Sequence, residues 1–286
     1  MPEPREEGAH VIETGTLKSK DGTELHTQYL SAPDARAVLV ILHGYGDHCG
    51  RFVHVMERFA QKGFDTASFD YRGHGKAGGK RGHVGRFSEY VEDLDAFLTY
   101  VLGRSSAGKK LYLVGHSHGG LVAASYVLQQ PEGIDGLILS SPLLGFKLKI
   151  PAWKNLLGKG MSAVWPTLSI PTGIPPEHLS HDPAIVTSYA NDPLVGKGAT
   201  SRWYTEAILA QQAVMRQAHR IQLPVLCLQA GEDLIVDADA TQNFVAAVGS
   251  ADKEIKWYEG LYHEIFNEPR REDVFGDIDV WLARHL

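Results

Sequence analysis

The sequence has 286 residues, of which 43% are hydrophobic and 22% are charged, and its formal net charge is −6. This composition excludes a largely disordered chain, and the acidic balance argues against general nucleic-acid binding, which needs a basic surface. The two cysteines, Cys49 and Cys227, exclude both a disulfide framework and a four-cysteine zinc site.

The first ten residues and the apolar runs show no secretion signal and no membrane-spanning segment. Residues 1–10 (MPEPREEGAH) lack the apolar core of a secretion signal. The longest apolar run, residues 37–42, is far shorter than the roughly 20 residues that span a bilayer. We therefore expect a cytoplasmic protein.

Short apolar runs alternate along the chain with longer amphipathic stretches. Two strands are predicted first, at 14–18 and 24–30, and the Asp21-Gly22 pair between them predicts a hairpin turn. The remaining predicted strands are 37–42, 66–69, 111–114, 136–139, 225–228 and 255–258. The predicted helices are 51–62, 87–102, 121–130, 239–248 and 270–285.

This alternation predicts an α/β protein. Strands that are apolar on both faces indicate a buried, mostly parallel sheet. Helices between successive strands indicate βαβ units, and hence a doubly wound sheet with helices on both faces.

The stretch from 146 to 220 interrupts the rhythm. It holds no good strand pattern, seven prolines and many apolar residues, among them Trp153, Met161 and Trp165. We expect a helical cap, or lid, inserted into a core made of residues 1–145 and 221–286. The alternative is a loop-rich helical segment that covers the sheet and has no role in function.

The strongest chemical signal is Gly115-His116-Ser117-His118-Gly119. This G-x-S-x-G pattern lies directly after a predicted strand and before a predicted helix, the context that makes it specific for a nucleophilic serine. The glycines allow a tight turn, and the helix N-terminus favours negative charge. We therefore predict Ser117 as the nucleophile.

A serine hydroxyl needs a general base, and the base needs an acid that orients it. In this fold the chain order is Ser, then Asp or Glu, then His. Asp233 and His263 follow the predicted strands 225–228 and 255–258, so we predict them as acid and base, with Glu232 and Asp237 as competitors for the acid. No second histidine stands at the spacing of a helical zinc motif, which argues against a metalloprotease.

Stabilising the oxyanion requires two backbone N–H groups aimed at one point. We expect one from His118, which follows the nucleophile, and one from the loop His43-Gly44-Tyr45-Gly46, at Tyr45. His43 precedes the serine, which is the wrong order for the base, so we expect a structural role. The glycine-rich stretch 72–81 lacks the spacing of a phosphate-binding loop and is interpreted as a surface loop.

Several segments together resemble the α/β-hydrolases of the monoacylglycerol lipase and lysophospholipase group. They are Leu42-His43-Gly44, Asp70-Tyr71-Arg72-Gly73-His74-Gly75, Gly115 to Gly120, Asn191-Asp192-Pro193-Leu194, and Tyr258 to Glu264. The resemblance implies an α/β-hydrolase fold, the triad Ser117, Asp233 and His263, oxyanion amides at Tyr45 and His118, and a mobile apolar lid over 146–220. The group commonly has Met or Gln where this chain has His118.

We thus expect a serine hydrolase that cleaves monoacylglycerols to a fatty acid and glycerol through an acyl-enzyme, without a metal or organic cofactor. Alternatives are a lysophospholipase, a short-chain carboxylesterase, an aminopeptidase, which the apolar lid disfavours, and a non-catalytic binding protein. The lysines at 147, 149, 154 and 159 alternate with apolar residues, which fits peripheral membrane contact through the cap; the competing interpretation is a solvated lid face. The expected partner is a small lipid ester.

Overall fold

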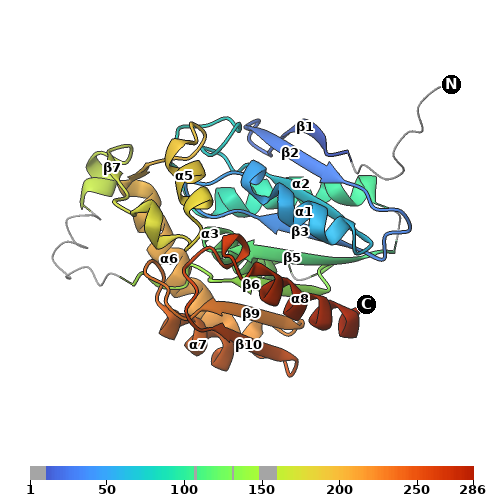
Figure 1. Ribbon diagram of the computed structural model, residues 1–286. Coiled ribbons are helices and arrows are strands. Elements are labelled where there is room, and N and C mark those ends of the chain that lie inside the picture. Colours follow the sequence, from blue (N-terminus) through green and yellow to red (C-terminus); the bar gives the residue numbers. More distant parts are fainter. Residues whose placement is uncertain (1–10, 106–107, 131, 148–159) are drawn as a thin grey trace.

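A computed structural model describes residues 11–105, 108–130, 132–147 and 160–286 (Figure 1). Its main feature is an eight-stranded sheet in the order β1-β2-β4-β3-β5-β6-β9-β10. The strands are β1 (Glu13–Lys18), β2 (Glu24–Leu30), β3 (Ala37–Leu42), β4 (Phe64–Phe69), β5 (Lys110–His116), β6 (Gly136–Ser140), β9 (Val225–Ala230) and β10 (Lys253–Tyr258).

The sheet is parallel from β4 to β10. Strand β3 pairs in parallel with β4 on one side and with β5 on the other. The chain therefore adds β4 on one side of β3 and then crosses back to add β5 on the other side. Ligands bind beyond the carboxyl ends of strands at such a switch point. The predicted hairpin is confirmed: β1 pairs antiparallel with β2, and β2 antiparallel with β4.

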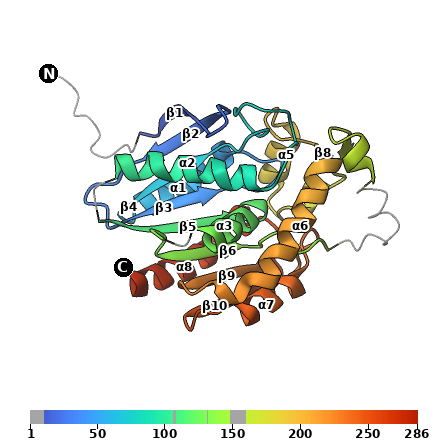
Figure 2. The same cartoon turned by 180° about the vertical axis from the view of Figure 1, so that it is seen from behind.

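Helices cover both faces of the sheet because the strands are apolar on both. In β3, Val40 packs in one core and the neighbouring Leu39 in the other. Figure 1 views the face with α1 (Val53–Ala60) and α8 (Arg271–His285). Figure 2 views the opposite face, with α2 (Ser88–Arg104), α3 (His118–Gln129) and α7 (Ala238–Ala247). The predicted α/β-hydrolase architecture is confirmed.

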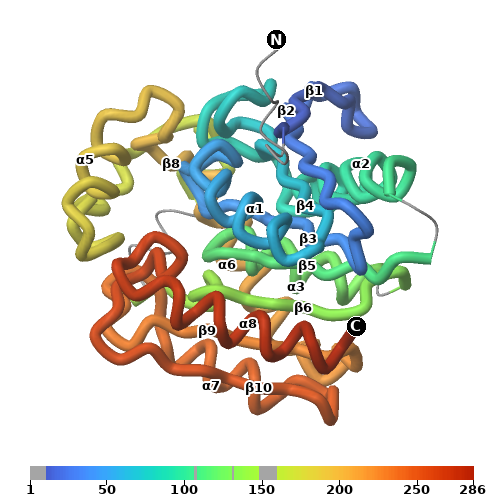
Figure 3. The backbone as a smooth tube through the Cα atoms, turned by 45° about the vertical axis from the view of Figure 1, so that its right-hand side comes forward, coloured from blue at the N-terminus to red at the C-terminus, as the bar shows by residue number. Residues whose placement is uncertain are grey.

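The described elements between β6 and β9 include β7 (Ser169–Pro171), the 3₁₀ helix η2 (Pro176–His178), α5 (Pro183–Asn191), β8 (Gly198–Thr200), α6 (Ser201–Gln217) and the 3₁₀ helix η3 (Ala218–Arg220). Strand β7 and helix α5 lie beyond one end of the sheet, opposite the C-terminal end of α8 (Figures 1 and 3), whereas α6 packs against α3.

The expectation of no strand in this segment is wrong in one respect. Strands β7 and β8 pair antiparallel, each over only three residues, which is too short for a periodic pattern to appear in the sequence. Trp153, Leu156, Leu157 and the lysines at 149, 154 and 159 lie outside the described residues. Within the part that is described, no helix combines the length and apolarity needed to cross a membrane.

Candidate active site

Ser117 lies at the turn between β5 and α3 with φ 51° and ψ −115°, a conformation that non-glycine residues rarely adopt. Such strain persists only where the surroundings hold the backbone. Here the Ser117 N–H donates to the Ser140 carbonyl at 2.9 Å, and the Ser117 carbonyl accepts from the Leu143 N–H at 2.9 Å. The turn that carries Ser117 is therefore held by hydrogen bonds to β6 and to the loop after it.

The glycines around Ser117 are required by close backbone packing. A Cβ atom on Gly119 would lie 2.2 Å from the Leu42 carbonyl oxygen at the end of β3. One on Gly115 would lie 2.6 Å from the Gly119 carbonyl oxygen. The G-x-S-x-G spacing thus lets the start of α3 pack directly against β3, which brings Ser117 beside the loop that follows β3.

Asp233 and His263, from the loops after β9 and β10, form a buried pair. The Nδ1 atom of His263 lies 2.8 Å from the Oδ2 atom of Asp233. The other carboxylate oxygen accepts from the Ile235 and Val236 N–H groups, at 2.8 and 2.9 Å. A carboxylate can only accept, so Nδ1 carries the proton and Nε2 is left as the basic nitrogen.

The electrostatics of the pair favour the charged form of both groups. Burial disfavours the imidazolium of His263, but the Asp233 charge and hydrogen bond outweigh it, and the pKa of His263 is raised above its ordinary value. Burial likewise opposes ionisation of Asp233, yet the nearby His263 and the backbone donors lower the pKa of Asp233. Such an arrangement stabilises the cation that forms when the histidine accepts a proton.

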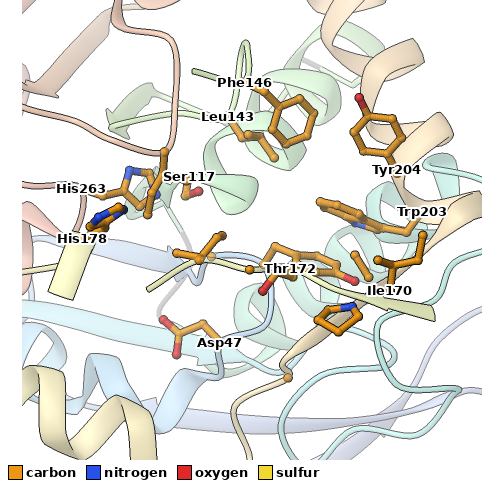
Figure 4. Close-up of a pocket in the computed structure, with 18 of the residues that line it drawn as sticks. Asp47, Ser117, Leu143, Phe146, Ile170, Thr172, His178, Trp203, Tyr204 and His263 are labelled. Carbon is orange, nitrogen blue, oxygen red and sulfur yellow. The ribbon is translucent and has the colours of Figure 1, made fainter. Parts of the chain in front are cut away.

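Ser117 and His263 both line a cavity of about 800 Å³, and Figure 4 shows their side chains on the same wall. The segment between β6 and β9 supplies much of the apolar lining. These residues are Phe146, Met161, Leu168, Ile170, Ile174, Trp203 and Tyr204. The cavity is large enough for a lipid-sized ligand, and most of its wall is apolar.

Tyr45 belongs to the loop after β3 and also lines the cavity. Its ring stacks on Trp203 of α6 with the centroids 3.5 Å apart. Its hydroxyl lies 2.9 Å from the Gly82 carbonyl and 3.1 Å from the Gly198 carbonyl. The loop that carries one predicted oxyanion donor is thus held by contacts with Trp203 and Gly198 of the segment between β6 and β9. The sequence analysis did not predict these contacts.

His118 begins α3, and its buried side chain lies among aromatic rings. The nearest rings are those of Tyr90 at 4.8 Å and Tyr71 and Phe87 at 5.6 Å. Neither ring nitrogen has a hydrogen-bond partner among the described residues. Burial holds the pKa of His118 well below its ordinary value, so the side chain is neutral. The side chain of His118 therefore packs among aromatic rings, and His118 is not among the residues that line the cavity.

A charged cluster beside His263 was missed by the sequence reasoning. Arg51 donates through Nη1 to Asp47 at 3.0 Å and through Nη2 to Glu264 at 2.7 Å. Tyr189 of α5 covers the guanidinium, with its ring centre 4.8 Å away. Asp47 and Glu264 line the cavity, whereas Arg51 does not. The only signal in the sequence was the position of the two acids, one inside the β3 loop motif and one directly after His263.

The other residues weighed in the sequence analysis, Glu232, Asp237 and His43, are not part of the Asp233–His263 pair. Glu232 is exposed, and Asp237 caps α7 by accepting from the Asp239 N–H, so neither competitor contacts His263 as Asp233 does. His43 has the predicted structural role: its Nδ1 lies 2.8 Å from the Gly44 carbonyl, and its Nε2 accepts from the Tyr71 N–H.

The interpretation of residues 72–81 as a surface loop is wrong for its first half. Arg72 is buried and donates to Asp93 of α2 through Nε at 2.8 Å and Nη2 at 2.6 Å. Burial of an arginine requires such pairing, and the partner lies 21 residues away, beyond the reach of local patterns.

Among the described residues, His26, Cys49 and Asp70 bring one potential metal ligand each within 4.8 Å of one another. Asp70 already accepts from the Cys49 and Lys76 N–H groups at 2.7 Å, which gives it a structural function. None of the three lines the cavity, so this group has no part in the site around Ser117.

Comparison with known proteins places this geometry in a family. Residues 33–270 match the family described as serine aminopeptidase, S33. The chain is 35% identical to the phospholipase YtpA of Bacillus subtilis over 241 residues, which cover 84% of this chain and 92% of that protein. It is 33% identical to a monoacylglycerol lipase of Mycolicibacterium smegmatis over 263 residues, which cover 88% of this chain and 90% of that protein.

A solved structure agrees with these relatives. The monoacylglycerol lipase of Paleococcus ferrophilus superposes with a TM-score of 0.84 at 32% identity, covering 92% of this chain and 99% of that one. The family match over residues 33–270 includes Ser117, Asp233 and His263. The chain therefore belongs to the serine aminopeptidase S33 family of α/β-hydrolases.

Proposed function

We propose that this protein is a serine hydrolase that cleaves the ester bond of monoacylglycerols, releasing a fatty acid and glycerol. The observation that carries the proposal is the strained Ser117, which shares an apolar cavity of about 800 Å³ with a histidine paired to a buried carboxylate. The relatives named as monoacylglycerol lipases support the substrate class.

The proposed acylation step uses each residue in one role. His263 Nε2 takes the proton of the Ser117 hydroxyl as the oxygen attacks the ester carbonyl, and Asp233 stabilises the resulting imidazolium. The backbone N–H groups of Tyr45 and His118 receive the oxyanion of the tetrahedral intermediate. His263 then gives its proton to the glycerol oxygen, the C–O bond breaks, and Ser117 is left acylated.

Deacylation repeats the chemistry with water. His263 removes a proton from a water molecule, the hydroxide attacks the acyl carbonyl, and the proton returns to the Ser117 oxygen as the fatty acid leaves.

We further propose that residues 146–220 act as a cap over the acyl chain. Exposed Val164, Trp165 and Ile170 (85%, 56% and 58% accessible) would touch the lipid surface from which the substrate comes. Flotation with anionic liposomes tests that contact, and protein that stays at the bottom of the gradient contradicts it.

The test of the function is glycerol release from a long-chain monoacylglycerol. We expect release by the wild type and none by Ser117→Ala. The control is Ser125→Ala, which makes the same change further along α3 and away from the cavity. Labelling by a fluorophosphonate reports the nucleophile independently of the substrate. Activity retained by Ser117→Ala, or an aminoacyl anilide cleaved faster than the lipid ester, would overturn the proposal.

A further inference from the structure

Three side chains around the proposed oxyanion donors form one group of rings. The Tyr45 ring stacks on Trp203 with the centroids 3.5 Å apart, and the His118 ring lies 5.9 Å from each of them. Tyr45 belongs to the loop after β3, His118 begins α3, and Trp203 lies in the first turn of α6. The rings therefore connect the two residues proposed as backbone donors to each other and to α6.

Ring packing holds His118 and Trp203 in this group. Both side chains are buried, and neither the ring nitrogens of His118 nor Nε1 of Trp203 have a hydrogen-bond partner among the described residues. Protein interiors are close-packed, so a change in the volume of one ring shifts its neighbours. The position of the Tyr45 ring therefore depends on the size and shape of the Trp203 side chain.

Hydrogen bonds fix Tyr45 at its hydroxyl and at the peptide group that follows it. The Tyr45 hydroxyl lies 2.9 Å from the Gly82 carbonyl and 3.1 Å from the Gly198 carbonyl. Burial raises the pKa of Tyr45, so the hydroxyl keeps the proton that it donates. The Gly46 carbonyl accepts from the Gly196 N–H at 2.7 Å, and a Cβ atom on Gly46 would lie 2.7 Å from the Gly196 carbonyl oxygen. The loop after β3 is thus held against the chain just before α6.

Helix α6 is a firm support for these contacts. It packs against α3 (Figure 2), and the side chains that it buries in the shared core include Ala207, Ala210 and Val214. At its start, the Thr200 hydroxyl oxygen accepts from the Trp203 N–H at 3.3 Å, and the same hydroxyl donates to the Gly82 carbonyl at 3.1 Å. Because that carbonyl also accepts from Tyr45, the first turn of α6 and the Tyr45 side chain are anchored at one point of the core.

We propose that Trp203 and the side chain of Tyr45 are positioning residues, which hold the Tyr45 backbone N–H in the place where it can receive the oxyanion. The proposal rests on the function proposed above and makes the first turn of α6 a part of the catalytic machinery. Oxyanion donors stabilise the transition state only when they are aimed at the developing charge. A misplacement of about 1 Å can lower the rate roughly 100-fold.

The test must separate positioning from simple contact with the acyl chain, because Trp203 also lines the cavity (Figure 4). Trp203→Leu removes the stacking surface and leaves the triad and both backbone donors in the chain. Its activity is compared on p-nitrophenyl acetate and p-nitrophenyl decanoate, which share a leaving group and differ in acyl length. We expect kcat to fall roughly 10- to 100-fold on both esters, since both pass through the same oxyanion. Loss of an acyl contact alone would raise KM for the decanoate and spare the acetate.

A trifluoromethyl ketone, 1,1,1-trifluorooctan-2-one, reports on the oxyanion without turnover. The Ser117 oxygen adds to its carbonyl carbon, the hydroxyl proton passes to His263, and the carbonyl oxygen becomes the oxyanion. An analogue of the transition state loses the interactions that the transition state loses. The Ki of this ketone for Trp203→Leu should therefore rise by about the factor by which kcat/KM falls.

A second variant tests the hydroxyl contacts of Tyr45. Tyr45→Phe keeps the ring and the backbone N–H but removes the hydrogen bond to Gly82 and Gly198, so kcat should fall about fivefold on both esters. Trp257→Leu on β10 and Tyr126→Phe on α3 make the same two changes at residues that do not line the cavity, and they should leave kcat unchanged. The unfolding temperature shows whether each variant is folded.

The outcomes separate this inference from the proposed function. Folded Trp203→Leu that keeps its kcat on the acetate, or whose Ki for the ketone does not change, would overturn the positioning role but leave the hydrolase standing. If Trp203→Leu does not fold, Tyr45→Phe decides, and unchanged kcat on both esters would overturn the role. Wild type that hydrolyses neither ester and resists the fluorophosphonate would overturn the proposed function, and the positioning role with it.

Discussion

Replacing Asp233 by asparagine tests the proposed triad with little change in shape. The Oδ1 atom that accepts from Ile235 and Val236 would be retained as the amide carbonyl. The amide NH₂ would then take the place of Oδ2, 2.8 Å from the His263 Nδ1. An NH₂ group can only donate, so Nδ1 must become the acceptor and the imidazole proton moves to Nε2. The nitrogen that should accept the Ser117 proton is then already protonated.

The expected loss follows from this change of tautomer. Where an orienting aspartate is replaced in this way in a serine hydrolase, kcat falls by roughly 10⁴, which corresponds to about 5.4 kcal/mol of transition-state stabilisation. We expect a loss of 10³- to 10⁴-fold in kcat for a monoacylglycerol and a similar fall in the rate of fluorophosphonate labelling. The unfolding temperature should change little, because the backbone contacts are preserved.

Glu232→Gln is the matched control. It neutralises the adjacent acid, whose side chain is exposed, and should keep nearly full activity. If Asp233→Asn retained more than a tenth of the wild-type kcat, the tautomer argument would fail. If Glu232→Gln lost as much as Asp233→Asn, the acid would have been assigned to the wrong residue.

The geometry also predicts a pH dependence of the rate and opposite effects of two glycine substitutions on stability. The rate should fall on the acid side with a midpoint above 6.5, because the catalytic base must be neutral and the Asp233 carboxylate raises the pKa of His263; a kcat/KM profile from pH 5 to 9 checks this, and a midpoint below 6 contradicts it. Gly119→Ala should lower the free energy of unfolding by about 3 kcal/mol, since its Cβ would meet the Leu42 backbone at 2.2 Å. Gly276→Ala, in α8 with open space around it, should instead raise that free energy by up to about 1 kcal/mol. Urea denaturation measures both, and equal effects would refute the steric argument.

Local patterns in the sequence predicted the elements and the order of the reactive residues. Runs such as Ala37–Leu42 are apolar at every position, and a strand buried on both faces requires that pattern. Gly115, Ser117 and Gly119 lie within five residues, and the strained turn depends only on their spacing. Asp233 and His263 could be predicted because each follows a recognisable strand.

Only the tertiary structure determines which side chains line the cavity and which contacts they make. The hydrogen bonds between Arg51 and Glu264 join residues 213 positions apart, and the stacking of Trp203 on Tyr45 brings α6 onto the loop after β3. The ring cage around His118 likewise combines residues from several elements. Periodicity and turn chemistry act over a few residues, so they predict where strands end but not which side chains meet beyond those ends. The ion pair between Arg51 and Glu264 beside His263 is such a long-range contact, and it became visible only in the folded chain.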